Sequence, residues 1–184
     1  MDKSRRALSF TLLAMLAAAG AAQSAEAASA GAIDADVNDA LSRFYHHVHG
    51  SRQLVRNAMG VLVFPRVIKA GMGVGGEYGE GALRIRGRTV AYFNTISASF
   101  GFQLGAQARS VIILFMTDDA LEQFRGTDGW KVGVDGSVAV ITVGVGGSID
   151  TNRIASPIVG FIFDGKGLMY NLTLEGSKIS QIYR

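Results

Sequence analysis

The sequence contains no cysteine, and this absence excludes several classes of protein. Without cysteine the chain has no disulfide bond, no thiolate metal ligand and no cysteine nucleophile. It also lacks the residue to which a bacterial lipoprotein attaches its lipid, because Ala19 stands where that cysteine would be. We therefore expect a protein that is not a lipoprotein and whose stability comes from packing of its core.

Histidine is also scarce, and all three histidines lie at the end of one predicted helix. His46 and His49 share a helix face, whereas His47 points elsewhere. Two imidazoles without a nearby carboxylate or thiolate make a weak metal site, so we prefer a stabilising interaction with the negative end of the helix. No G-x-S-x-G nucleophile elbow is present. The sequence therefore predicts no enzyme activity, no metal and no cofactor.

Neither sign of charge is in large excess. The formal net charge is only +3, and part of it belongs to the first six residues. Such a small excess does not by itself indicate a nucleic-acid partner, and we predict none. Any electrostatic function must come from local clustering of basic residues.

The first 27 residues have the composition of a secretory signal peptide. A short basic start precedes the apolar run Ala7–Ala22, which is shorter than the roughly 20 residues that a membrane-spanning helix needs. We predict cleavage after Ala27, with Ser24 or Ala30 as alternatives. The paired arginines near the start leave both general and twin-arginine export open.

Residues 28–184 are then expected to form a single domain that is periplasmic or secreted. A chain of this length suits one domain, and the sequence shows no repeat and no linker.

Helices are predicted first, and strands follow with one helix inserted among them. Apolar spacing and capping residues predict helices at about 34–48, 51–58 and 117–126. Strands are predicted at 61–64, 72–78, 82–86, 90–93, 97–106, 110–115, 131–143, 158–163 and 168–174. Residues 67–70 are interpreted as a connector, residues 79–81 as a hairpin turn, and a short helix is considered for 177–183.

Most connections between these strands are too short for parallel crossovers. The 24 glycines exceed what a flat sheet needs, and glycine within strands marks bulges and strong coiling. The fold class predicted is α+β, with a strongly curved antiparallel β-sheet or partial barrel, N-terminal helices and one inserted helix.

One glycine-rich stretch, Gly71–Gly76, matches the pattern G-x-G-x-x-G. A dinucleotide site needs a helix that starts inside this pattern and offers its positive end to the pyrophosphate. Here another strand follows, so we interpret these glycines as structural.

Basic residues alternate with apolar ones in the segment Ala82–Arg88. Strand residues two apart share a face, and guanidinium groups bind phosphate through paired hydrogen bonds. The candidate head-group-binding residues are Lys69, Arg84, Arg86 and Arg88, with Arg52, Arg56 and Arg66 as further candidates. The alternative is that these arginines only solvate an edge strand and protect it from aggregation.

Several segments together resemble a known family. They are Ala58–Pro65 with Lys69–Gly71 and the glycines up to Gly81, then Ser99–Gln107 (SFGFQLGAQ), and finally Gly165–Leu168 with Leu174–Ser177. In this order they are similar to the SYLF domain, also called the Ysc84 actin-binding domain, and they span nearly all of the chain after the predicted signal peptide.

The resemblance implies lipid binding. Family members bind membrane lipids, eukaryotic members prefer phosphoinositides, and some bundle actin. This chain departs from the family pattern at residues 92–97 and 169–171, so the expected partners are anionic phospholipids in general rather than phosphoinositides. Actin is not an expected partner of a secreted bacterial protein.

The sequence thus predicts a periplasmic domain that associates peripherally with anionic membrane head groups through a basic strand face. Two alternatives remain open. One is a structural or protein-interaction module of the cell envelope, and the other is a carrier of a small apolar ligand inside the curved sheet.

Overall fold

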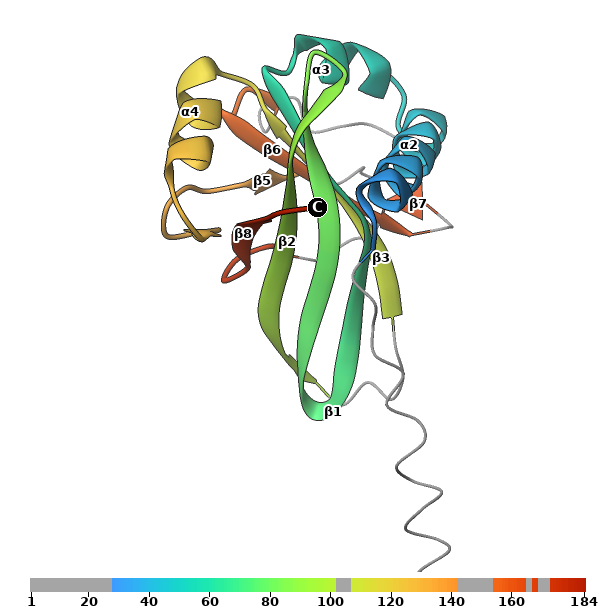
Figure 1. Ribbon diagram of the computed structural model, residues 1–184, viewed down its shortest axis with the longest axis vertical. Helices are drawn as coiled ribbons and strands as arrows, with labels where there is room; N and C mark the ends of the chain where they lie inside the picture. The colour runs from blue at the N-terminus through green and yellow to red at the C-terminus, as the bar shows by residue number, and fades with distance from the viewer. Residues whose placement is uncertain (1–27, 102–106, 142–153, 165–166, 169–172) are drawn as a thin grey trace, which may run out of the picture.

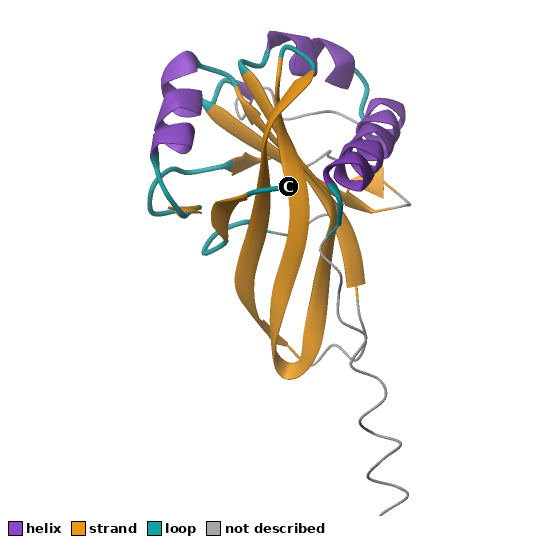
Figure 2. Ribbon diagram, in the orientation of Figure 1, coloured by secondary structure: helices purple, strands orange, loops and turns teal. Residues whose placement is uncertain are grey.

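The computed structural model describes residues 28–101, 107–141, 154–164, 167–168 and 173–184. In this part of the chain, three helices surround one strongly curved sheet (Figures 1 and 2). They are α2 (Ala30–His47), α3 (Ser51–Asn57) and α4 (Asp118–Gly126).

Capping residues set the helix starts. α2 begins earlier than predicted, because the hydroxyl of Ser29 accepts a hydrogen bond from the Ala32 N–H at 3.2 Å. α3 follows Gly50, whose φ of 80° reverses the chain, while Ser51 is already helical and donates its hydroxyl to the Phe44 carbonyl. At α4 the predicted cap is confirmed, since the Thr117 hydroxyl accepts from the Ala120 N–H at 3.3 Å.

The sheet contains eight strands in the described residues. They are β1 (Gly60–Ile85), β2 (Arg88–Gly101), β3 (Gln107–Phe115), β4 (Trp130–Lys131), β5 (Ala139–Val140), β6 (Ile158–Asp164), β7 (Gly167–Leu168) and β8 (Lys178–Ile182). Their order is β4-β8-β2-β1-β3-β6-β5, and β7 pairs with β6. All pairs are antiparallel except β5 with β6. The predicted α+β class with a curved half-barrel sheet is confirmed.

The long strand β1 doubles back on itself at the lower end of the molecule (Figure 1). Its first arm pairs with β3 and its second arm pairs with β2. The predicted connector at 67–70 and the predicted turn at 79–81 are therefore wrong, because both segments lie within β1. Gly81 instead allows a close approach of the two arms, since a Cβ there would lie 2.0 Å from the Val63 carbonyl oxygen.

The turn of the β1–β2 hairpin lies at Arg86 and Gly87. Both residues have positive φ, 50° and 78°, and they join Ile85 directly to its partner Arg88. Two positive φ angles in a two-residue loop match the right-handed twist of the flanking strands.

Residues 61–64 in the first arm of β1 are buried on both faces, as predicted. Leu62 and Phe64 join a core on the side of α4, whereas Val61 and Val63 join a second core beneath α2. Alternate strand residues point to opposite faces, so one strand contributes to both cores. Trp130 is 1% exposed and belongs to the core on the α4 side.

Two further predictions about the C-terminal half are wrong. The expected long strand at 131–143 is reduced to the short strands β4 and β5, separated by a turn. The segment considered as a helix at 177–183 is instead β8, which pairs with both β2 and β4. Parts of the predicted strands, at 102–106, 142–143 and 169–172, lie outside the described residues, whereas residues 173–174 are described and are not in a strand.

Candidate functional site

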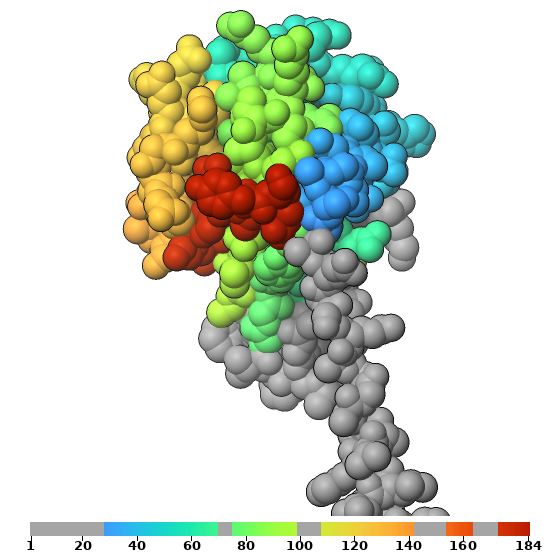
Figure 3. All heavy atoms as spheres, viewed as in Figure 1, coloured from blue at the N-terminus to red at the C-terminus, as the bar shows by residue number. Residues whose placement is uncertain are grey.

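A groove of about 350 Å³ lies between α2, α3 and the tip of the β1–β2 hairpin. It is lined by Leu41, Tyr45, Val55, Arg56, Ala58, Val61, Arg84, Arg86 and Gly87. We call it the arginine groove. In Figure 3 the light-green hairpin tip projects at the top of the view, next to the teal surface of α3.

Four arginines lie in the lining of the groove or against its Tyr45. Arg56, Arg84 and Arg86 line the groove with it, and the guanidinium of Arg52 stacks 4.5 Å from the ring centroid. Burial raises the pKa of Tyr45, and the positive charges of Arg52, Arg84 and Arg56 oppose that rise. The groove thus combines positively charged guanidinium groups with the apolar side chains of Leu41, Val55, Ala58 and Val61.

The positive charge of the groove is only partly neutralised. No carboxylate is among its lining residues in the described part of the chain. Arg56 donates to the neutral side chain of Gln53. Among the groove arginines in the described part of the chain, only Arg84 has a carboxylate nearby, that of Asp34 at 3.7 Å. Such an arrangement suits a ligand with an anionic head and an apolar tail, because guanidinium groups prefer oxyanions.

The four predicted site residues do not form one row on a strand face. Arg84 is in β1 with only 14% of its side chain exposed, Arg86 is in the turn and Arg88 begins β2. Lys69 lies nine residues along β1 from Gly60, which places it roughly 30 Å from the α3 end of the molecule. The structure brings Arg84 and Arg86 together in the groove and leaves Lys69 apart.

The groove also includes residues of α2 and α3, which the alternation of residues in a strand could not identify. Arg52 and Arg56 were secondary candidates, and Arg66 lies elsewhere, in a second groove beside Pro65 and Tyr78. Tyr45 lies within the helix predicted at 34–48, and the sequence gives it no separate role. Tyr45 lies near the end of α2, and α3, which contains Arg52 and Arg56, follows directly. This sequence pattern could have identified Tyr45 as a site residue.

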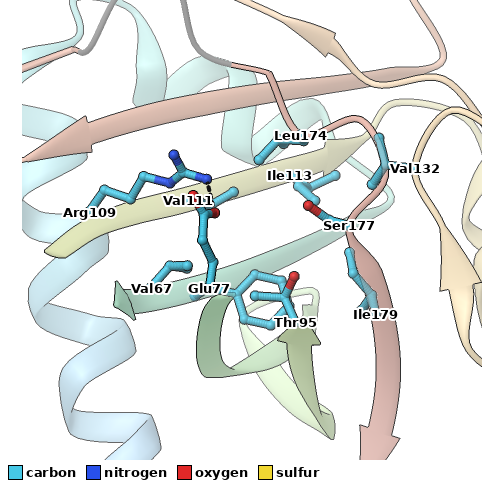
Figure 4. A pocket seen from close by; sticks show the side chains of 11 residues that line it. Val67, Glu77, Thr95, Arg109, Val111, Ile113, Val132, Leu174, Ser177 and Ile179 are labelled. Atoms are coloured by element: carbon cyan, nitrogen blue, oxygen red, sulfur yellow. Dashed lines mark hydrogen bonds and ion pairs between the residues drawn. The ribbon is translucent and has the colours of Figure 1, made fainter. Parts of the chain in front are cut away.

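A second polar site lies inside the curve of the sheet, as Figure 4 shows. Glu77 of β1 forms an ion pair with Arg109 of β3, and Ser97 donates its hydroxyl to the same carboxylate at 3.3 Å. The enclosed space beside them is about 10 Å³, enough for about one water molecule. Most of the other lining side chains are apolar and fill the surrounding space, so the space that remains is too small for an apolar ligand.

The other motifs acquire no ligand site in the described residues. Gly71–Gly76 lies within β1, and no helix starts inside the pattern. The rings of His46 and His47 contact each other at the end of α2. No cluster of three or more metal-ligating side chains occurs in the described part of the chain.

The structure thus joins a half-barrel sheet to a groove lined by arginine and apolar side chains. Residues 96–183 match the family model described as Ysc84, Las17-binding protein actin regulator. For these residues the match confirms the resemblance to the Ysc84 (SYLF domain) family that was found in the sequence. This is a family of binding modules, known for binding lipid and actin. No curated protein matches the chain.

Proposed function

We propose that the chain is a peripheral lipid-binding domain of the periplasm or the extracellular space, which binds anionic phospholipids through the arginine groove. Residues 1–27 would be removed on export, and residues 28–184 would act as one domain. The observation that carries the proposal is the convergence of Arg52, Arg56, Arg84 and Arg86 on a groove whose lining holds no carboxylate in the described residues.

The energetics favour reversible association with a membrane surface. A basic side chain near an anionic bilayer contributes about 1 kcal/mol, so three or four together give about 3 to 4 kcal/mol. Salt screens most of this attraction, since the Debye length falls to about 3 Å at 1 M ionic strength. No helix in the described residues combines the length and the apolar character needed to span a bilayer.

Exposed apolar residues near the groove support shallow contact with lipid. Met59 follows α3 and is 39% exposed, and Val90 lies close to the hairpin tip and is 48% exposed. Apolar side chains beside basic ones let a protein insert slightly into the head-group region while its charges meet phosphates. Arg88 sits at the same tip and would add to this surface, whereas Lys69 would not.

Co-sedimentation with vesicles tests the proposal. The chain beginning at Ala28 should pellet with vesicles that contain phosphatidylglycerol or cardiolipin, should stay in solution with pure phosphatidylcholine, and should be released by high salt. Arg86→Gln should weaken binding more than Arg66→Gln, which removes the same charge outside the groove. Failure to bind either kind of vesicle would overturn the proposal.

A further inference from the structure

Arg84 is shared between the arginine groove and the neighbouring helix α2. Its Nη1 donates to the Asn38 side chain at 2.7 Å, and its Nη2 lies 3.4 Å from the Asp34 carbonyl oxygen. The Asp34 carboxylate is farther away, at 3.7 Å, which is beyond hydrogen-bond distance. The Nε of Arg84 is buried and finds no hydrogen-bond partner among the described residues. Arg84 therefore has one unused donor, which can reach an oxyanion in the groove only when the guanidinium turns.

Asp34 does not depend on Arg84 for its own hydrogen bonds. Thr89 donates its hydroxyl to Oδ1 at 2.7 Å, and Tyr92 donates its hydroxyl to Oδ2 at 3.0 Å. Both donors are on β2, so the carboxylate would remain satisfied if the guanidinium turned toward a ligand. Removing one partner of a pair is costly only when the other partner is left unsatisfied.

We infer that Asp34 sets the affinity of the arginine groove, because its carboxylate competes with the phosphate of an anionic lipid for Arg84. This inference rests on the function proposed above. In the free protein Asp34 and Asn38 hold Arg84 against α2. In the bound protein the guanidinium exchanges part of that contact for the phosphate, and Asp34 keeps its two hydroxyl donors. Asp34 thus lowers the affinity and keeps the groove selective for strongly anionic surfaces.

The test compares two substitutions on the same helix. Asp34→Asn keeps an oxygen that accepts from Thr89 or Tyr92 but removes the charge that competes for Arg84. Asp39→Asn removes the same charge from the exposed side of α2. Binding to phosphatidylglycerol vesicles should strengthen about fivefold more for Asp34→Asn than for Asp39→Asn, as expected when one basic contact becomes available.

Two further variants make the result specific to Arg84. Asn38→Ala leaves the net charge unchanged and removes the Nη1 contact, so it should also strengthen binding, to a smaller extent. In an Arg84→Gln background, Asp34→Asn should give no more gain than Asp39→Asn, because the shared group is gone. Circular dichroism and urea unfolding report whether each variant is folded.

The outcomes separate this inference from the proposed function. If the unaltered chain does not bind anionic vesicles, the proposed function fails. If it binds, and neither Asp34→Asn nor Asn38→Ala strengthens binding beyond the Asp39→Asn control, the role of Asp34 is overturned. A gain that persists in the Arg84→Gln background also overturns it, since the effect would then be general electrostatics.

Discussion

Two regions of this molecule differ in whether a carboxylate neutralises their arginines. Inside the curve of the sheet, Arg109 is matched with Glu77, and both side chains are largely buried. At the arginine groove, Arg56, Arg84 and Arg86 share one lining and Arg52 lies over Tyr45, and among the described residues only Arg84 of these four has a carboxylate within 4 Å. A buried charge needs a partner within the protein, whereas unneutralised charge at the surface is available to a ligand. Under the proposed function, Arg109 serves the fold and the groove arginines serve binding.

The largest expected effect is on stability, at the interior pair. Glu77→Gln leaves the Arg109 guanidinium buried without its counter-ion, and such a change typically costs about 3 to 5 kcal/mol of unfolding free energy. Urea unfolding measures it. Arg86→Gln, at the exposed turn of the groove, should change stability by less than about 0.5 kcal/mol. Equal costs for the two substitutions would remove the distinction between the regions.

The next effect is on binding, at the groove. The combined variant Arg52→Gln, Arg56→Gln and Arg86→Gln should lose about 3 kcal/mol of affinity for anionic vesicles, roughly a hundredfold. The control variant Arg66→Gln, Arg125→Gln and Lys131→Gln loses the same charge at exposed positions outside the groove. Vesicle titration should show a much smaller loss for the control. Matching losses would mean that overall charge, and not the groove, directs binding.

A smaller effect on stability is expected at Gly81, where the two arms of β1 approach each other closely. A Cβ at Gly81 would lie 2.0 Å from the Val63 carbonyl oxygen and 2.8 Å from the ring of Phe64, and Phe64 lines the interior cavity. Gly81→Ala should therefore cost about 1 to 3 kcal/mol through overpacking. Gly126→Ala, with no atom within 4 Å, should not destabilise. Thermal melting distinguishes them, and an undisturbed Gly81→Ala would contradict the close crossing of the β1 arms.

The smallest effect is an alkaline loss of stability on the groove side. Burial, followed by the hydrogen bond to Asp34, raises the pKa of Tyr92 above its ordinary value of 10.0. A raised pKa means that the folded state holds the phenol proton longer, so this contribution is present below pH 10 and is lost as the pH rises through the raised pKa. Unfolding at pH 8 and pH 10.5 should show a shallower decline for Tyr92→Phe. An unchanged decline would exclude Tyr92 as its source.

Local patterns predicted most of the elements but not their connections. The apolar stripe that ends at Val48 and the Thr117 cap fix helices by contacts within a few residues. Glycine was ambiguous, because the same residue permits a turn or a close approach of two strands. Gly79 and Gly81 were interpreted as a turn, whereas each lies against the first arm of β1. The true turn at Arg86 was missed because Asn or Asp usually precedes glycine in such loops.

The candidate site was harder to predict for a similar reason. Arg84 and Arg109 look alike in the sequence, since both lie in apolar strands. Their partners, Asp34 and Glu77, are 50 and 32 residues away along the chain, and only the path of β1 brings these groups together. Arg84 was predicted to bind phosphate because of its chemistry, but which other arginines act with it depends on tertiary structure.

Amide hydrogen exchange with and without phosphatidylglycerol vesicles tests the central claim most directly. If the arginine groove meets the lipid, exchange should slow in residues 51–59 and 84–90 and stay unchanged in residues 118–132. Protection confined to the opposite end of the β1–β2 hairpin, in residues 75–80 and 95–98, would contradict the assignment of the site, as would bound protein with no protection at the groove.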